Sequence, residues 1–181
     1  MSFGLGRASA NAATPEDDDI DSSTPWIAAS DGDLPLLQKS LARLQLPVTT
    51  ADDNGYTLLQ AAASYSQLPV MDWLLSTSRQ QTPDQTTVLV SAVDQEGDSA
   101  LHYASTVDAV KRLIDAGIDV HHKNQAGKTA LEHKQEELEN LMEEAEDENN
   151  GDDEDDGNED DEARNLREVI AYLSSLPTQS Q

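Results

Sequence analysis

The sequence predicts an all-α protein built as a short solenoid of helix-turn-helix repeats. Two observations lead to this fold class. A twelve-residue template occurs three times, at 52–63, 94–105 and 124–135, and the first two copies are followed by apolar residues at helical spacing. Repeated units of this kind bury their apolar faces against their neighbours, so a chain that carries them forms a stack.

The composition limits the classes of partner. The chain has 181 residues, with 36 acidic and 11 basic side chains and a formal net charge of −25. This balance argues against direct binding to DNA, RNA or an anionic membrane, because such binders need cations to displace counterions from phosphates. It favours a basic partner or simple solubility. A sequence without cysteine has no disulfide, thiolate metal site or cysteine nucleophile.

The first residues, 1–21, are rich in small polar side chains and predict a flexible N-terminus. They lack the apolar core of a signal peptide, and no run of 18 apolar residues occurs in the sequence. We therefore expect a soluble protein of the cytoplasm and/or the nucleus. Across 22–140 short apolar stripes alternate with turn signals, and this is where a core can form.

Each copy of the template begins with Asp or Asn, continues with Gly three residues later, and then places Thr or Ser. Asp or Asn followed by Gly favours a turn that needs a positive φ. The Thr or Ser occupies a helix N-cap position, and the Leu and Ala that follow give a helix a closely packing face. A second apolar stripe completes a helix pair, with Met71, Leu74 and Leu75 in one unit and Val110, Leu113 and Ile114 in the next.

These motifs resemble the ankyrin repeat, whose pattern joins a D-x-x-G turn to T-P-L-H-x-A-A and V-x-x-L-L. The best match is SALHYAS followed by VKRLIDAGIDVHHKNQAGKTAL, and TPWIAASDGDLPLLQKSL at 24–41 resembles an N-terminal unit. The resemblance covers residues 24–135. It implies an ankyrin solenoid of about three and a half to four units within 22–140.

The spacing of the units departs from the regular period at two places. Thr24 and Thr57 are 33 residues apart, as the family's period requires, but Thr57 and Ser99 are 42 apart. About nine residues are therefore inserted after the second unit. Ser99 and Thr129 are only 30 residues apart. The third unit thus lacks about one helical turn at its helix junction, which predicts a less regular stacking partner.

The fourth unit is interrupted by an acidic run. Fourteen of the twenty residues from Glu143 to Glu162 are Asp or Glu. Such a block repels itself and buries no apolar area, so we predict a disordered acidic loop over 141–162. Apolar residues recur at helical spacing over 163–176, which we interpret as the missing second helix, capping the stack, with a tail at 177–181. The alternative is a free amphipathic helix beyond a disordered tail.

The sequence contains no catalytic constellation, and we expect no enzyme activity, cofactor or metal. His102 occupies the histidine position of the ankyrin motif, where the family uses this residue to support the turn. The spacing of His121, His122 and His133 is not that of a zinc site. The acidic loop lacks the features of an EF-hand, and no phosphate-binding glycine loop or nucleophile elbow occurs.

Because ankyrin repeats bind proteins, the resemblance implies a non-catalytic protein-protein interaction module. We expect a monomer whose partner is another protein and neither nucleic acid nor a membrane. An acidic escort chaperone for a basic client, such as a ribosomal protein or a histone, is the alternative.

The family's contacts come from turn tips and first-helix faces. By motif alignment, the corresponding positions are Asp53, Asn54, Tyr56, Gln60, Ser64, Tyr65, Gln95, Glu96, Asp98, Tyr103, Gln125 and Lys128. Tyrosine combines a large apolar area with a polar tip, which suits Tyr65 and Tyr103 to a concave binding face. For both tyrosines, ordinary contact between repeats is the alternative interpretation.

Overall fold

The computed structural model describes residues 20–81, 83–148 and 161–177. Over these residues the chain forms helices and isolated antiparallel bridges but no extended strand. The prediction of an all-α solenoid is confirmed. In chain order the helices are α1 (Thr24–Asp31), α2 (Leu34–Leu44), α3 (Leu58–Ser64), α4 (Leu68–Gln81), α5 (Pro83–Ser91), α6 (Ala100–Tyr103), α7 (Val107–Asp115), α8 (Ala130–Glu148) and α9 (Asp161–Ser175).

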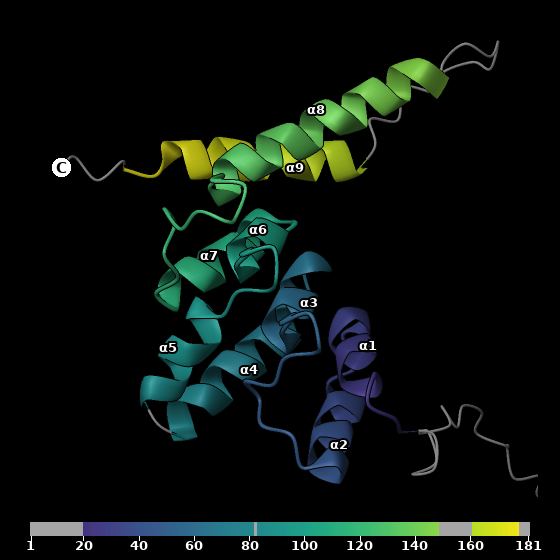
Figure 1. Cartoon of the computed structure of the whole chain (residues 1–181), viewed down its shortest axis with the longest axis vertical. Coiled ribbons are helices and arrows are strands. Elements are labelled where there is room, and N and C mark those ends of the chain that lie inside the picture. Colours follow the sequence, from purple (N-terminus) through teal and green to yellow (C-terminus); the bar gives the residue numbers. More distant parts are fainter. Residues whose placement is uncertain (1–19, 82, 149–160, 178–181) are drawn as a thin grey trace, which may run out of the picture.

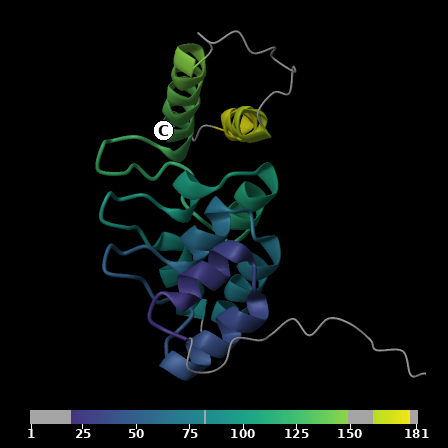
Figure 2. The same ribbon diagram turned by 90° about the vertical axis from the view of Figure 1, so that its right-hand side faces the viewer.

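The helices are stacked in two layers along the long axis of the molecule (Figure 1). The inner layer contains α1, α3, α6 and α8, each packed on the next. The outer layer contains α2, α4, α7 and α9, and in it α7 packs on both α4 and α9. Three hairpin loops project from the edge beside the inner layer (Figure 2). We call these loops the fingers; they comprise residues 51–57, 93–99 and 123–129, and each is closed by one antiparallel bridge.

The repeated template explains the shape of the fingers. In the first finger, Asp52 Oδ1 accepts a hydrogen bond of 2.8 Å from the backbone N–H of Tyr56, and Gly55 lies at a φ of 81°. Asp94 and Asn124 accept the equivalent bond in the second and third fingers. The Asp or Asn of the template therefore closes the turn, and the Gly adopts the left-handed conformation that the turn requires.

Hydrogen bonds between neighbouring fingers keep them at a close spacing. The N–H of Gln95 donates to the carbonyl oxygen of Asn54 at 2.8 Å, and the N–H of Gln125 donates to that of Glu96 at 2.9 Å. This spacing leaves no room for a side chain at Gly97, where a Cβ would lie 2.9 Å from the backbone nitrogen of Gln125. The fingers thus form one continuous edge rather than three separate loops.

The core lies between the two layers and continues through every unit. Inner-layer helices contribute small side chains, among which Ala28, Ala61 and Ala63 are fully buried. Outer-layer helices contribute larger ones, and Leu74 and Leu113 are also fully buried. Alanine faces allow the inner helices to approach closely, while leucines fill the space between the layers.

Both departures from the repeat period have a structural counterpart. Within the inserted residues the chain forms α5, an additional helix that packs on α4. In the shortened third unit, the first helix α6 has four residues, whereas α3 in the second unit has seven. The third unit therefore has a shorter inner-layer helix than the second unit.

Helix α9 covers the last unit of the stack. It packs on both α7 and α8, and it buries Leu166, Val169 and Leu173 against them. This packing is the arrangement that the predicted capping helix requires.

The start of the acidic loop differs from the sequence expectation. The loop was expected from residue 141, but α8 continues to Glu148. Glu, Leu, Met and Ala are good helix formers, so the helix extends past its last packed turn despite the charge. The rest of the acidic run, 149–160, lies outside the described residues, as do residues 1–19 of the predicted flexible N-terminus 1–21 and the end of the tail.

Candidate protein-binding surface

A groove lies between the fingers and the inner layer in the C-terminal half of the stack. Its hollow measures about 550 Å³. The second and third fingers supply one side, including Glu96 and Lys128, and α8 supplies His133 and Glu136 on the other. The groove is therefore formed by polar and charged side chains from two different units.

The surface around this groove is strongly acidic. We define the groove face as the three fingers together with α8 up to Glu143. It carries ten acidic and three basic side chains, and therefore a formal charge of −7. The acidic side chains are those of Asp52, Asp53, Asp94, Glu96, Asp98, Glu132, Glu136, Glu137, Glu139 and Glu143, and the basic ones are those of Lys123, Lys128 and Lys134.

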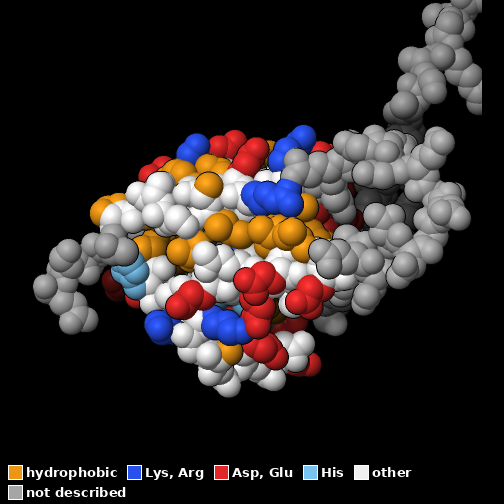
Figure 3. Space-filling view, turned by 90° about the horizontal axis from the view of Figure 1, so that it is seen from above, with side chains coloured by type: hydrophobic (Ala, Val, Ile, Leu, Met, Phe, Trp, Pro, Cys, Tyr) orange, Lys and Arg blue, Asp and Glu red, His pale blue; other side chains and the backbone are white. Residues whose placement is uncertain are grey.

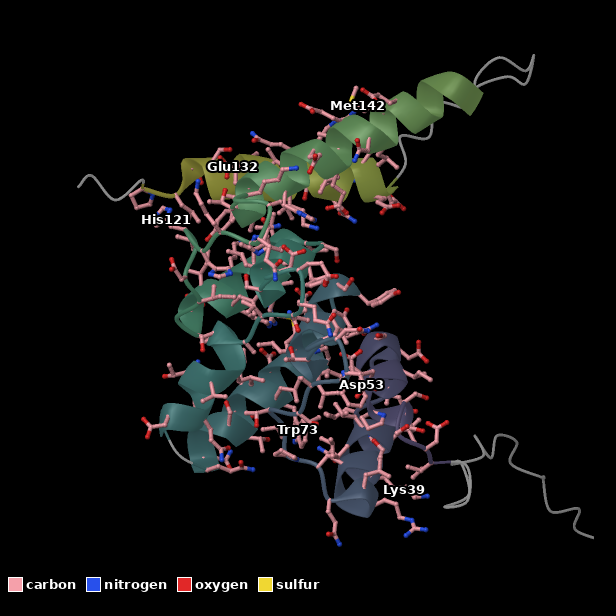
Figure 4. All side chains as sticks on the ribbon, in the orientation of Figure 1. Lys39, Asp53, Trp73, His121, Glu132 and Met142 are labelled. Atoms are coloured by element: carbon pink, nitrogen blue, oxygen red, sulfur yellow. The ribbon has the colours of Figure 1, made fainter. Side chains whose placement is uncertain are left out.

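The outer layer has the opposite balance. Its four helices carry six acidic and seven basic side chains, and therefore a formal charge of +1. In Figure 4, Asp53 and Glu132 mark the first finger and the start of α8, whereas Lys39 lies on α2 of the outer layer. Seen from above, Asp and Glu side chains lie on both sides of an apolar band at the C-terminal end, with the larger group on one side (Figure 3). The charge of the stack is thus divided between its two sides.

Local hydrogen bonds favour the ionised form of two carboxylates on α8. The N–H and hydroxyl of Thr129 donate to Glu132 and hold the pKa of that carboxyl below its usual range. A hydrogen bond from the ammonium of Lys128 lowers the pKa of Glu136. Both sets of hydrogen bonds therefore favour the charged form of these two carboxyls.

The structure places the twelve predicted contact residues at three levels of exposure. The exposed ones are Asp53, Asn54, Tyr65, Gln95, Glu96 and Gln125. The half-buried ones are Tyr56, Ser64, Tyr103 and Lys128. The buried ones are Gln60 and Asp98.

The assignment of Gln60 to a binding surface is corrected by its burial. Its side chain is fully buried. The Oε1 atom accepts a hydrogen bond of 2.6 Å from the N–H of Thr57, and the Nε2 atom donates to the carbonyl oxygen of Asp98 at 2.7 Å. Gln60 therefore caps α3 and joins it to the next finger. The sequence carried this signal, because a Thr followed three residues later by Gln is a capping box.

The assignment of Asp98 to the contact surface is likewise corrected, because its side chain bonds one finger to the next. It is 8% exposed, and its Oδ1 accepts a hydrogen bond of 2.7 Å from the side-chain amide of Asn124. A partner that approached the groove would meet the exposed neighbour Glu96 first.

The two half-buried tyrosines of the fingers and inner layer support each other. The hydroxyl of Tyr103 donates to Asp94 Oδ2 at 2.6 Å, and its ring meets that of Tyr56 edge to face with 5.1 Å between centroids. Burial and the bond to Asp94 raise the pKa of Tyr103. Tyr103 thus makes an ordinary contact between repeats, whereas Tyr65 is 64% exposed.

Three histidines cluster at the junction of the third and fourth units. The ring of His102 lies 5.9 Å from that of His122 and 5.8 Å from that of His133, centroid to centroid. His122 Nε2 lies 2.8 Å from the carbonyl oxygen of Gly97, which fits a hydrogen bond within the fold. Within the described parts of the chain, no group of three or more His, Asp or Glu side chains has the arrangement of a metal site.

The acidic residues on α8 were missed when contact positions were assigned from the sequence. Glu132, Glu136, Glu139 and Glu143 are all exposed. Their spacing of three or four residues places them along one side of a helix, and this signal is visible in the sequence. Motif alignment selected only the turn tip of the fourth unit, at Gln125 and Lys128, and no residue on its first helix.

A family profile described as ankyrin repeats, in three copies, matches residues 25–124. This match spans more than half of the 181 residues. The chain belongs to the ankyrin-repeat family. As an ankyrin-repeat protein it is a protein-interaction module, and the fingers and inner layer described above are its repeated elements. Each described helix of this ankyrin protein is too short or too polar to traverse a bilayer.

Two known proteins are similar to this chain over part or most of its length. A probable serine/threonine-protein kinase of Dictyostelium discoideum is 28% identical over 116 residues, which span 60% of this chain but only 11% of the kinase. One chain in the crystal structure of the yeast ribosomal protein Rps3 in complex with its chaperone Yar1 has 26% identity and a TM-score of 0.57. That likeness covers 78% of this ankyrin protein and 100% of the other chain.

Proposed function

We propose that this ankyrin protein escorts a basic client protein, such as a ribosomal protein, and binds it along the groove face. The observation that carries the proposal is the division of charge, with −7 on the groove face and +1 on the outer layer. A basic client is therefore attracted more strongly to the groove face than to the outer layer. Complementary charge of this kind orients the encounter and raises the association rate.

The solved structure that resembles this chain supports the same class of partner. That crystal structure contains a ribosomal protein together with its chaperone. A protein that binds RNA needs cations for the phosphates. An acidic groove that covers those cations keeps the client from RNA until it is released, and this defines an escort role.

The mode of action that we propose is binding and not catalysis. The similarity to a kinase spans 11% of that protein, so it does not favour kinase activity here. The groove's polar groups at Asp98 and Asn124 bond to each other across two fingers, as structural groups do. We further propose that the protein is a monomer and acts in the cytoplasm or the nucleus.

Affinity capture from cell extract tests the proposal. The full chain serves as bait, beside a neutralised variant of the groove face with Asp53→Asn, Glu96→Gln, Glu139→Gln and Glu143→Gln. We expect ribosomal proteins or histones to be enriched at low salt and lost at moderate salt, because screening weakens exposed charge pairs. The neutralised variant should retain less of the same clients.

A different outcome would change the conclusion. If one non-basic partner persists at moderate salt and with the neutralised variant, the protein is a general ankyrin adaptor whose acidic residues serve solubility. In that case the groove face binds by shape and apolar contact, and the escort role is rejected.

A further inference from the structure

The shortened third unit leaves a notch in the inner layer. Helix α6 ends at Tyr103, while α3 on one side and α8 on the other extend further. A hollow of about 320 Å³ remains between them. Its lining includes Tyr65, Ser105, Lys134, Glu137, Glu162 and Leu166, which come from the second, third and fourth units and from α9.

Hydrogen bonds hold the floor of this notch in place. The hydroxyl of Ser66 lies 2.9 Å from that of Ser105 and 2.7 Å from that of Thr106. These contacts join the turn after α3 to the short junction between α6 and α7. The N–H of Ser105 also donates to the carbonyl oxygen of Ala63 at 3.4 Å. The notch is therefore a formed feature of the stack, set by the missing helical turn.

One side of the notch is aromatic. Tyr65 ends α3, and its ring is 64% exposed, which makes it the most exposed large hydrophobic side chain among the described residues. An aromatic face that is open to solvent attracts cations through the ring quadrupole.

The opposite side of the notch is charged. Glu137 and Glu162 contribute two carboxylates, and Lys134 contributes one ammonium. Lys134 is 4% exposed, and its Nζ lies 2.8 Å from Glu137 Oε2, so its charge is already compensated. The net charge of the lining is therefore −1, which favours a cation over an anion.

We propose that the notch binds a single arginine side chain of the client, which lies over the ring of Tyr65 and points its guanidinium at the carboxylates of Glu137 and Glu162. This inference rests on the proposed function, because it requires a basic client. Arginine fits better than lysine because its planar guanidinium stacks on an aromatic face and pairs with carboxylates in a fixed geometry. The notch would thereby fix the register of the client along the stack.

Binding of short cationic peptides to the full chain tests the notch directly. The probes are an N-acetylated, C-amidated hexa-arginine peptide and the matching hexa-lysine peptide, titrated at constant salt by fluorescence anisotropy. We expect Tyr65→Ala to weaken hexa-arginine binding about fivefold, whereas Tyr65→Phe, which keeps the ring, should change it by less than about twofold. The effect of Tyr65→Ala on hexa-lysine should be smaller.

A matched pair of charge variants distinguishes binding at the notch from general electrostatic attraction to the acidic chain. Glu162→Gln and Glu168→Gln each remove one negative charge from α9, but only Glu162 lines the notch. We expect Glu162→Gln to weaken hexa-arginine binding more than Glu168→Gln does. Melting curves of all the variants check that the fold is kept.

The possible failures point to different conclusions. If hexa-arginine binds but Tyr65→Ala has no effect and the two Gln variants are equal, the notch is rejected while a basic client on the groove face remains supported. If neither cationic peptide binds the unmodified chain, both the notch and the charge basis of the escort role are rejected.

Discussion

At the scale of single residues, His102 shows how one side chain joins two units. Its Nδ1 accepts a hydrogen bond from the N–H of Ser99, and its Nε2 donates to the carbonyl oxygen of Lys128 in the next finger, at 3.3 and 3.2 Å. Burial lowers the pKa of His102 from the ordinary value of 6.5, an effect that the bond to Lys128 and the charge of Asp98 partly offset. The imidazole is therefore neutral at pH 7.

The lowered pKa of His102 makes the stability of the third unit depend on pH. Below about pH 6.5 the unfolded chain takes up a proton at this position more readily than the folded chain. The contribution of His102 is thus complete above pH 6.5 and is lost as the pH falls. We expect the free energy of unfolding to drop more between pH 7.5 and 5.5 in the wild type than in His102→Gln. Equal losses in denaturant titrations would contradict this account.

Two equivalent glycines test the spacing of the fingers. Gly97 and Gly127 have φ values of 79° and 75°, but a Cβ at Gly97 would lie 2.9 Å from the next finger's backbone, whereas Gly127 has nothing within 4 Å. Gly127→Ala should lower the free energy of unfolding by about 1 kcal/mol from the left-handed conformation alone. Gly97→Ala should lower the free energy of unfolding by clearly more, because its Cβ would also meet the backbone of the next finger. Similar losses in chemical denaturation would show that the fingers can separate easily.

At the scale of whole helices, the account depends on α9 as the cap of the stack. Leu173 is buried against the fourth unit, whereas Ala171 on the same helix is exposed. Leu173→Asp should lower the free energy of unfolding by about 3 kcal/mol or more, because it loses apolar contact and buries a carboxylate. Ala171→Asp, which adds the same charge, should melt close to the wild type. An unchanged melting temperature for Leu173→Asp would instead favour a free tail helix.

Helices were predictable where a local motif determines them. The Asp/Asn–Gly–Thr/Ser template located the fingers and the starts of α3, α6 and α8, because side-chain bonds within five residues close each turn. The end of α8 was not predictable from charge, since helix propensity outweighs repulsion as far as Glu148. The inserted residues carry no sequence motif that predicts α5. This helix forms where it can pack on α4.

At the scale of the molecule, the functional surface was only partly predictable. Motif alignment selected the exposed finger tips, such as Asp53 and Glu96, because the family pattern marks them. It also selected Gln60, whose capping box with Thr57 is visible in the sequence but whose bond to Asp98 in the next finger is not. The division of charge between groove face and outer layer depends on which helices share a layer. The assignment of helices to the two layers is a property of the whole stack and not of any one repeat.

The most direct test of the account is the affinity of the hexa-arginine peptide for two matched double variants. One pair, Asp53→Asn with Glu96→Gln, lies on the groove face; the other, Asp115→Asn with Glu168→Gln, lies on the outer layer. Each pair changes the formal net charge from −25 to −23. The account predicts about fivefold weaker binding for the groove-face pair and unchanged binding for the outer pair at low salt. Equal weakening by both pairs, or no binding by the unmodified chain, would contradict it.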